Sequence, residues 1–579
     1  MVKKYTWKIG GEAGFGIKSA GLTFSKICTR AGYEIFDGSD YPSLIRGGHN
    51  TYQVTVSDRS VYSLEQQVDL LVALNQNTVD FHWDELNHGA AVVYDKTTTK
   101  IPKHSAEKNI RLYHVPFKEI IQQAEGIIIM RNVVAMGATM ALMKLPFRLL
   151  DASLQEAFAK KPKLIPMNVR AAKAGYDYVQ KAYKEEEYKI DLSHFTPRDK
   201  KHERLIIPGN EAIALGALAA GCNFFAAYPM TPSSSLLHYL ASVAQEQKII
   251  VKHAEDEISV INMALGASHV GARAMIGTSG GGFALMVEAL GLAGITETPL
   301  VIVEVQRPGP ATGLPTWTGQ SDLQFVLHAA QDEFPRIILA PGDTEECFYL
   351  TAQAFNWAEM YQLPVIILSD KYLAEGYRST VPFDVEKVKI NRGKLLTAAA
   401  AARAKDFKRF KVTADGVSPR TLPGMKGGEF LANSDEHDEY GFSQESSANR
   451  IAQYDKRARK LATAVKILNG ATVYGNPKAK KTIVAWGSTK GPILDALATM
   501  KRADEFKLLH LNVIWPFPKE TVTKVLDSSK KVILMENNGT GQLGQIIAQE
   551  TGFEIRQRFL KYDGRPLFPE EIRRHLQDL

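Results

Sequence analysis

The sequence predicts an α/β protein with three α/β domains, and three observations support this class. Short β-branched runs alternate with longer helical patterns almost throughout, as in parallel sheets with crossover helices. The chain has 579 residues, more than a single hydrophobic core organises. Two segments with little apolar periodicity, 183–204 and 376–455, interrupt the alternation. We therefore expect domains at 1–190, 205–375 and 456–579, with 376–455 as an extended, irregular linker across the surface.

The first domain is expected to begin with a strand, a glycine-rich turn and a helix. Residues 5–10 read YTWKIG, the next residues read GEAGFGIKSAGLTFSKICTRAG, and a second strand reads YEIF. The runs VDLLVAL, AAVVYD and IRLYHVP continue the alternation, and residues 162–167 are expected to form a further strand. Residues 183–204 are charged and contain proline, so they are expected to link two domains.

The second and third domains repeat the alternation of strands and helices. Strands of the second domain are expected at 206–208, 223–229, 248–254, 272–279, 299–305, 336–341 and 364–370. Strands of the third domain are expected at 482–488, 506–516 and 531–538. Between the two domains, residues 376–455 are dense in Gly, Pro, Asp and Ser, which favours irregular structure.

The charge and the cysteines argue against several functions. The formal net charge is +7, from 70 basic and 63 acidic residues, and no basic run is interleaved with aromatic residues, so no nucleic-acid partner is expected. Cys28, Cys222 and Cys347 form no CxxC pair. We therefore expect three buried free thiols, and neither an iron–sulfur cluster nor another metal bound by this chain alone. No signal-like segment and no uncharged apolar run of about 18 residues occur, so a cytoplasmic protein without a membrane span is expected.

Residues 226–235, AAYPMTPSSS, form a stiff segment at the predicted end of a strand. Ligands of open α/β sheets bind at this edge. Pro232 suits the first turn of the next helix and restricts Thr231 to an extended conformation. The hydroxyl groups of Thr231 and Ser233 could face an anion at the helix start, or could simply cap the helix.

An acidic cluster, residues 255–257, opens the next predicted helix. Acidic residues at a helix N-terminus commonly interact with the helix dipole, at about 0.3–1 kcal/mol each. Glu255 and Asp256 fit this role, whereas Glu257 directly precedes the apolar face of the helix and is the candidate for a buried carboxylate. The following strand ends in a second glycine-rich turn, Thr278-Ser279-Gly280-Gly281-Gly282.

Together these motifs resemble a known family. YPMTPSS, EDEISVINMALGA, TSGGGF and QRPGPATGLPT are similar to motifs of the alpha subunit of the 2-oxoacid:ferredoxin oxidoreductases, which are thiamine-diphosphate enzymes. The second domain thereby resembles their pyrimidine-binding domain. GGEAGFGIKSAG and DYPSLIRGGHNTYQV resemble the Rossmann-like gamma domain, fused in front, and NVIWPFP and ENNGTGQLG resemble the transketolase-C-like domain. The resemblance covers nearly the whole chain.

The resemblance implies roles for individual residues. A carboxylate that hydrogen-bonds to the pyrimidine ring nitrogen of thiamine diphosphate favours the imino tautomer, which removes the thiazolium proton; Glu257 is our choice for it. Thr231 and Arg307 would bind the ketone and carboxylate of the substrate. The implied substrate-binding residues are Thr231, Arg307, Thr316, Tyr228 and Ser233. The implied cofactor-binding residues are Glu257, Tyr228, Pro229, Thr278, Ser279 and Gly280.

Two features of a complete enzyme are absent from the sequence. The chain contains no Gly-Asp-Gly motif for the diphosphate and Mg²⁺, and no cluster cysteines. The resemblance places both, with the [4Fe-4S] cluster, on a beta subunit, so this chain is expected to form half of an active site in an alpha–beta heterodimer or its dimer. The implied reaction converts a 2-oxoacid and coenzyme A to acyl-CoA and CO₂ with electrons passed to ferredoxin.

The substrate is less well determined than the reaction. We favour 2-oxoglutarate, with pyruvate or a broad range of 2-oxoacids as the alternative. The second carboxylate of 2-oxoglutarate would need a further cation, for which His253, Arg46 and Lys371 are available.

The N-terminal glycines suggest two other functions. Gly14 and Gly16 follow a strand and open a helix, and Asp37 ends the next strand, which resembles a dinucleotide fingerprint with Ser19 in place of its third glycine. A nicotinamide-dependent dehydrogenase is therefore an alternative, although it leaves YPMTPSS and QRPGPATGLPT unexplained. In the family the gamma domain is associated with coenzyme A, so Gly14 and Gly16 are also candidates for its phosphates. A non-catalytic scaffold subunit is the third alternative.

Overall fold

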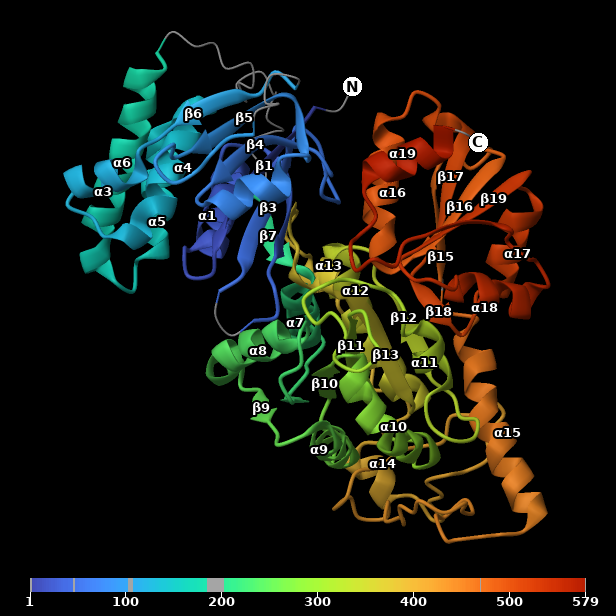
Figure 1. Cartoon of the computed structure of the whole chain (residues 1–579). Coiled ribbons are helices and arrows are strands. Elements are labelled where there is room, and N and C mark those ends of the chain that lie inside the picture. Colours follow the sequence, from blue (N-terminus) through green and yellow to red (C-terminus); the bar gives the residue numbers. More distant parts are fainter. Residues whose placement is uncertain (1–2, 45–46, 103–107, 185–202, 469, 578–579) are drawn as a thin grey trace.

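The computed structural model describes residues 3–44, 47–102, 108–184, 203–468 and 470–577. They form three sheets with helices packed against them (Figure 1), so the predicted α/β class with three sheet-containing regions is confirmed. The sheets are mixed rather than purely parallel, because each contains at least one antiparallel pair. Among these residues no single helix is long and apolar enough to cross a membrane, although a bent pair, Phe117–Gln123 with Ile128–Leu142, could by length and composition alone.

The first sheet has eight strands in the order β6-β5-β4-β1-β3-β2-β14-β7. Its first six strands are β1 (Lys4–Glu12), β2 (Glu34–Asp40), β3 (His49–Ser57), β4 (Val68–Ala73), β5 (Leu86–Tyr94) and β6 (Arg111–His114). Strand β3, which we did not predict, runs antiparallel to both β1 and β2. Its alternation of Tyr52, Val54 and Val56 is a period-2 signal that could have indicated it.

Helices cover both faces of this sheet. They are α1 (Ile17–Arg30), α2 (Gln76–His82), α3 (Phe117–Gln123), α4 (Arg131–Leu142), α5 (Phe147–Ala157) and α6 (Ile165–Ala182). The strand predicted at 162–167 is wrong, because a 3-10 turn, Pro162–Leu164, leads directly into α6. Pro166 is tolerated there because the first turn of a helix needs no N–H donor. The predicted linker at 183–204 lies almost entirely outside the described residues.

Two strands from later in the sequence complete the first sheet. Strand β7 (Leu205–Pro208), predicted to begin the second domain, pairs antiparallel with β14 (Tyr377–Thr380), and β14 pairs with β2. The buried carboxylate of Asp37 accepts a hydrogen bond from the Tyr377 N–H group at 2.9 Å. These contacts join the first and second units.

The second sheet has the order β18-β12-β13-β11-β10-β8-β9. Its strands β8 (Phe224–Ala227), β9 (Ile250–His253), β10 (Ala274–Thr278), β11 (Leu300–Gln306), β12 (Ile337–Leu339) and β13 (Pro364–Asp370) are parallel and confirm the predicted strands. The helices between them are α7 (Gly209–Ala219), α8 (Ser234–Gln247), α9 (Glu257–His269), α10 (Gly280–Ile295), α11 (Leu323–His328), α12 (Thr344–Tyr361) and α13 (Lys371–Glu375). The carboxyl ends of β8, β10 and β11 therefore meet at one edge.

Residues 376–455, which we expected to be an irregular linker, are irregular only in part. They contain the short helix α14 (Ala398–Ala402), but α15 (Ser447–Ala464) begins inside the range 376–455 that we predicted as linker. In Figure 1 the segment passes below the central sheet and returns through α15. Lys460 lies 2.5 Å from the buried carboxylate of Glu297, and Arg409 donates to the Glu297 carbonyl. The segment is therefore anchored in the central unit rather than merely laid across its surface.

The third sheet has the order β15-β17-β16-β19-β20. Its elements are β15 (Ala471–Gly475), β16 (Lys481–Trp486), α16 (Lys490–Thr499), β17 (Phe506–Leu511), α17 (Lys519–Asp527), β19 (Lys531–Glu536), α18 (Gln542–Thr551), β20 (Gln557–Leu560) and α19 (Pro569–Gln577). The strand predicted at 506–516 is divided, because its second part, β18 (Val513–Trp515), joins the central sheet beside β12. Cys28, Cys222 and Cys347 are free and buried, as predicted.

Candidate functional site

The candidate site lies at the N-terminus of α10, where three consecutive glycines touch three other motifs. A Cβ atom at Gly280 would lie 2.5 Å from the Asp322 carboxylate, and one at Gly281 would lie 3.5 Å from the end of Met230. At Gly282 it would meet the Glu257 carboxylate at 2.7 Å. Any larger side chain at Gly280 or Gly282 would displace these groups. The motifs that the sequence shows far apart are thus adjacent in space.

The YPMTPSS segment begins where β8 ends, as predicted. Ser233 is the N-cap residue of α8, but its hydroxyl group donates to the Met230 carbonyl at 2.7 Å and caps no N–H group of the helix. Pro232 precedes this N-cap, so it is not in the first helical turn as we expected. The hydroxyl group of Ser233 therefore does not cap the helix.

Glu257 is the first residue of α9 and is 4% exposed. Among the residues that the structure describes, none donates a hydrogen bond to its carboxylate or forms an ion pair with it. The neighbouring acids behave as helix-start residues: Asp256 accepts from the Ser259 N–H group at 2.7 Å, and Glu255 accepts from the Ser259 hydroxyl group. The predicted division between one buried carboxylate and two helix-start acids is present in the structure.

Arg307 and Thr231 lie together. The Arg307 Nη1 group donates to the Thr231 carbonyl oxygen at 2.6 Å. Burial lowers the pKa of Arg307, and the nearby carboxylates of Asp322 and Glu304 oppose this by raising it. Farther along the same loop Thr316 is buried, and among the described residues no group bonds its hydroxyl oxygen.

The C-terminal unit holds the loop that carries Arg307 and Thr316. The Gln320 side chain donates to the Trp486 carbonyl at 3.0 Å, and the Asn538 side chain donates to the Gln320 carbonyl at 3.0 Å. The Arg565 guanidinium lies 3.3 Å from the centre of the Trp317 ring. The transketolase-C-like region thus positions a loop of the central unit, which its sequence motifs did not indicate.

Two acidic residues of the site were not predicted. Glu304 on β11 is fully buried, and Asp322 precedes α11 beside Gly280. Burial raises the pKa of Glu304 well above its ordinary value, and raises that of Asp322 to about 6. A single carboxylate within the apolar run LVIVEV was a signal that could have revealed Glu304.

The remaining predicted residues are distributed unevenly around the site. Tyr228 and Pro229 are exposed after β8, and the Tyr228 ring lies 6.3 Å from the ring of His253. Thr278 lies beside Glu304 in the sheet, and the hydroxyl oxygen of the buried Ser279 has no hydrogen-bond partner among the described residues.

Other sequence candidates lie elsewhere. Lys371 donates to the Ser39 carbonyl at 2.6 Å and so faces the N-terminal unit. Gly14 and Gly16 are at the start of α1 in that unit, and Asp37 is buried under hydrogen bonds from Ser25 and Tyr52. Its carboxylate is therefore not available to a ribose, which argues against the dinucleotide interpretation. Arg46 lies outside the described residues.

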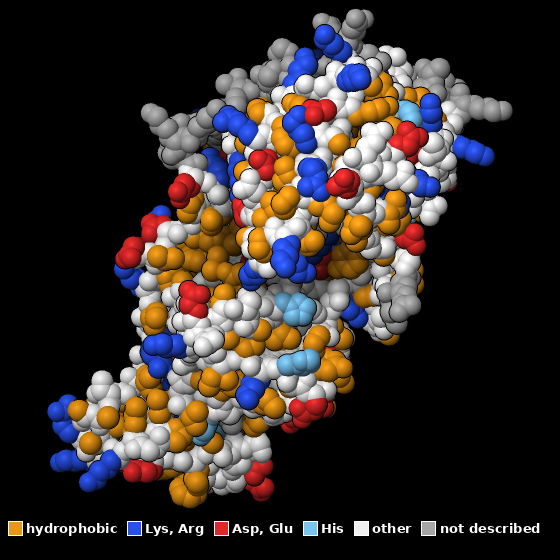
Figure 2. All heavy atoms as spheres, turned by 90° about the vertical axis from the view of Figure 1, so that its left-hand side faces the viewer, with side chains coloured by type: hydrophobic (Ala, Val, Ile, Leu, Met, Phe, Trp, Pro, Cys, Tyr) orange, Lys and Arg blue, Asp and Glu red, His pale blue; other side chains and the backbone are white. Residues whose placement is uncertain are grey.

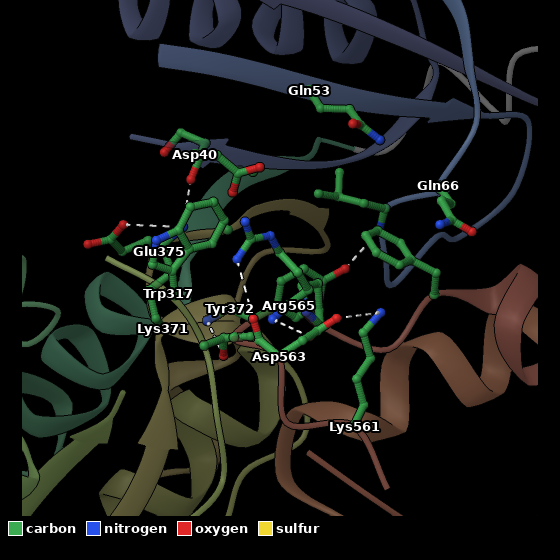
Figure 3. A pocket seen from close by; sticks show the side chains of 18 of the residues that line it. Asp40, Gln53, Gln66, Trp317, Lys371, Tyr372, Glu375, Lys561, Asp563 and Arg565 are labelled. Atoms are coloured by element: carbon green, nitrogen blue, oxygen red, sulfur yellow. Dashed lines mark hydrogen bonds and ion pairs between the residues drawn. The ribbon is translucent and has the colours of Figure 1, made fainter. Parts of the chain in front are cut away.

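A separate cavity of about 270 Å³ lies where the three units meet (Figure 3). Its walls include Lys371 and Glu375 from the central unit, Asp40 from β2, and Lys561 and Arg565 from the C-terminal unit. The basic groups already have partners: the Lys561 ammonium group lies 2.7 Å from Glu571, for example. Apart from Lys371, none of the predicted site residues that the structure describes lines this cavity.

Comparisons with known proteins agree with this arrangement. Three family models match this chain. Residues 6–178 match the model of pyruvate ferredoxin/flavodoxin oxidoreductase, and residues 215–456 match the thiamine-diphosphate-binding region of pyruvate flavodoxin/ferredoxin oxidoreductase. Residues 479–572 match core domain II of pyruvate:ferredoxin oxidoreductase. The 2-oxoacid:ferredoxin oxidoreductase subunit alpha of a Sulfolobus species is 34% identical to this chain. The matched region spans 98% of this chain and 96% of the Sulfolobus protein.

Two further similarities involve proteins named for 2-oxoglutarate. The 2-oxoglutarate oxidoreductase subunit KorA of Mycobacterium tuberculosis is 28% identical over 98% of this chain and 90% of its own length. The structure of 2-oxoglutarate:ferredoxin oxidoreductase from Magnetococcus marinus, with 2-oxoglutarate, coenzyme A and succinyl-CoA bound, has 31% identity and a TM-score of 0.92 over 100% of this chain and 99% of that chain. The chain therefore belongs to the family of 2-oxoacid:ferredoxin oxidoreductase alpha subunits, with a gamma-like domain fused at its N-terminus.

Proposed function

We propose that this chain forms half of the active site of an enzyme that oxidises 2-oxoglutarate with coenzyme A to succinyl-CoA, CO₂ and reduced ferredoxin. The observation that carries the proposal is the buried carboxylate of Glu257, which has no partner among the described residues and faces the glycines of α10 at the edge of the central sheet. The alternative is an enzyme for pyruvate or for a range of 2-oxoacids. The bound 2-oxoglutarate named for the Magnetococcus marinus structure favours the first substrate.

The residues at this edge fit thiamine diphosphate. The glycine run lets the start of α10 pack directly against Glu257, and the Ser279 hydroxyl group has no partner among the described residues. When bound, the cofactor supplies the nucleophilic carbon that attacks the ketone of a 2-oxoacid. Glu257 would hold a proton between its carboxylate and the pyrimidine ring nitrogen. Tyr228, Pro229, Thr278 and Gly280 are proposed to complete this part of the site.

Arg307 and Thr231 are proposed to bind the substrate. One guanidinium nitrogen of Arg307 is engaged by the Thr231 carbonyl, which orients the rest of the planar group toward a carboxylate. The Thr231 hydroxyl group has no hydrogen-bond partner among the described residues, and Ser233 and Thr316 lie on the same two loops. His253, exposed beside Tyr228, is the cation best placed for a second carboxylate.

A beta subunit is proposed to complete the site with the diphosphate, Mg²⁺ and the [4Fe-4S] cluster. Elements around the site expose large apolar side chains, including Ile250 (55%), Ile258 (52%) and Leu285 (53%). Figure 2 faces the side that carries α8 and β9, and hydrophobic side chains gather there in and around a recess. Exposed apolar surface of this kind commonly marks a protein interface.

Coenzyme A is proposed to approach through the N-terminal unit. Gly14 and Gly16 have positive φ angles, and the space around a Cβ atom at Gly14 is open. Gly16 is the N-cap of α1 and has no side chain that could cap the helix N–H groups. These groups could bind a phosphate of coenzyme A.

The substrate assignment is tested by steady-state kinetics of the assembled enzyme. Reduction of ferredoxin should show a larger kcat/KM with 2-oxoglutarate than with pyruvate, each with saturating coenzyme A. A larger kcat/KM with pyruvate would reject the assignment, and equal values would favour a broad-range enzyme.

Thr231→Val should lower kcat/KM for the oxoacid without affecting assembly. Loss of a hydroxyl that pairs with a buried polar group costs about 1–3 kcal/mol, which is a decrease of about 5- to 160-fold. Thr231→Ser retains the hydroxyl group and should keep most of the activity. Unchanged kinetics of the valine variant would mean that the stiff loop only begins a helix.

A further inference from the structure

Another cavity, of about 330 Å³, lies where α11, α15 and the C-terminal unit meet (Figure 1). None of the predicted site residues that the structure describes lines it. Small-molecule sites commonly have volumes of roughly 300–1,000 Å³, so this cavity can hold a compact organic molecule. Its apolar walls are formed by Leu327, Phe334, Pro335, Ala458, Leu461 and Trp515.

Arg336 is a charged residue of these walls that is buried without a counter-charge. It is 4% exposed, and its Nη1 group donates to the Val326 carbonyl, in the last turn of α11, at 3.1 Å. Its guanidinium carbon lies 4.3 Å from the centre of the Phe334 ring. Among the residues that the structure describes, no carboxylate lies within ion-pair distance of Arg336, and the Val326 carbonyl is its only hydrogen-bond acceptor. Because a guanidinium group has five N–H donors, most of those of Arg336 have no acceptor.

The other charged side chains of the walls are solvated or paired. Asp332 and Glu333 are exposed, and Arg457 donates to both carboxylate oxygens of Glu436. Burial lowers the pKa of Arg336 to about 10, so its guanidinium group is still charged at neutral pH. A buried charge without a partner is unfavourable. The group that this cavity lacks is therefore an anion beside Arg336.

We propose that the cavity binds a small aromatic monocarboxylate, whose carboxylate pairs with Arg336 and whose ring packs against Phe334 and Trp515. The planar guanidinium group matches a carboxylate in a bidentate pair. The aromatic side chains of the walls favour an aromatic body. One negative charge is preferred over two, because the exposed carboxylates of Asp332 and Glu333 repel a second one. The proposal does not depend on which oxoacid the enzyme uses.

The cavity should remain open when a beta subunit binds. Trp515 belongs to β18, which forms one edge of the central sheet. The opposite edge is β9, which carries the exposed Ile250 of the surface proposed for the beta subunit. A small molecule, rather than that partner, is therefore the expected occupant.

Fluorine NMR titrations of the assembled complex test the site with two matched probes, para-trifluoromethylbenzoate and the neutral para-trifluoromethylbenzyl alcohol. The benzoate should bind the parent complex more tightly than the alcohol does. Arg336→Met should weaken benzoate binding by about ten- to a hundredfold, the usual contribution of hydrogen bonds to a charged group. The same variant should bind the alcohol as the parent does, since the alcohol forms no ion pair with the guanidinium group.

Two further variants control for a general loss of charge and for misfolding. Arg556→Met removes an exposed arginine outside the cavity and should leave the benzoate affinity unchanged. Ala458→Trp fills the cavity from an exposed position of α15, leaves Arg336 in place, and should abolish binding of both probes. This variant decides the question if the Arg336 variant does not fold.

Three results would reject the proposal. The first is equal affinity of the parent complex for the two probes, and the second is benzoate binding that survives both Arg336→Met and Ala458→Trp. Benzoate held at the proposed substrate site would give this second result and would depend on Arg307→Met instead. The third is benzoate that binds the isolated chain but not the assembled complex, because a partner subunit would then occupy the cavity.

Discussion

Glu257→Gln should leave an enzyme that assembles and binds thiamine diphosphate but turns over 100 to 10,000 times more slowly. Glutamine keeps the size of the side chain and one hydrogen bond, but it cannot hold a proton at the pyrimidine ring nitrogen. A positioned proton-transfer group contributes on the order of 10²–10⁴ in rate. The measurement is kcat for ferredoxin reduction with saturating oxoacid, together with cofactor binding by calorimetry on the assembled complex.

Glu255→Gln is the matched control for this experiment. Glu255 lies two residues earlier and is exposed, and its carboxylate accepts from the Ser259 hydroxyl group rather than facing the glycines of α10. Its substitution should change kcat by less than about twofold, since exposed helix-start acids contribute only about 0.3–1 kcal/mol to stability. Near-normal turnover of the Glu257 variant would assign the proton to another residue.

The purified chain alone should bind no iron and reduce no ferredoxin. Its three cysteines are far apart in the sequence, and all are free and buried, so they cannot surround a cluster. Burial also raises the pKa of the Cys28 and Cys347 thiols, which disfavours the thiolate form that ligates iron. Co-expression with a beta-type subunit should supply both the visible absorbance of the cluster and the activity. Both should be absent from the chain alone and present in the complex.

The control for this prediction is the fold of the isolated chain. Circular dichroism and size-exclusion chromatography should show a folded protein, so that missing activity is not due to unfolding. Iron–sulfur absorbance from this folded chain without a partner would contradict the division of the site between two subunits.

Elements that depend on short-range pattern were predicted well. Most parallel strands of the central sheet are apolar runs of the expected length, and β8, β10, β12 and β13 end at or within two residues of a proline or a helix-capping residue. The start of α9 could be predicted for the same reason, because Asp256 and Glu257 directly precede its apolar face. Ser233, one of the two residues offered as a cap, is the N-cap residue of α8, but Pro232 precedes it instead of lying in the first turn.

Longer-range pairing could not be read from these patterns. Strands β7 and β14 complete the N-terminal sheet, and β18 completes the central one, because an open sheet edge accepts any strand of suitable length that the chain brings to it. Local sequence does not specify which edge that is.

The sequence by itself determined the fold class, the family and the residues Glu257, Thr231 and Arg307, whose roles stay predictions. Only the tertiary structure placed Glu257 against Gly282, Arg307 against Thr231 and Asp322 against Gly280. The physical reason is that composition and hydrophobic periodicity indicate only the local preference of each residue, such as burial or a position at the start of a helix. Which residues meet, and how completely water is removed from them, is decided only when separate strands and loops pack together.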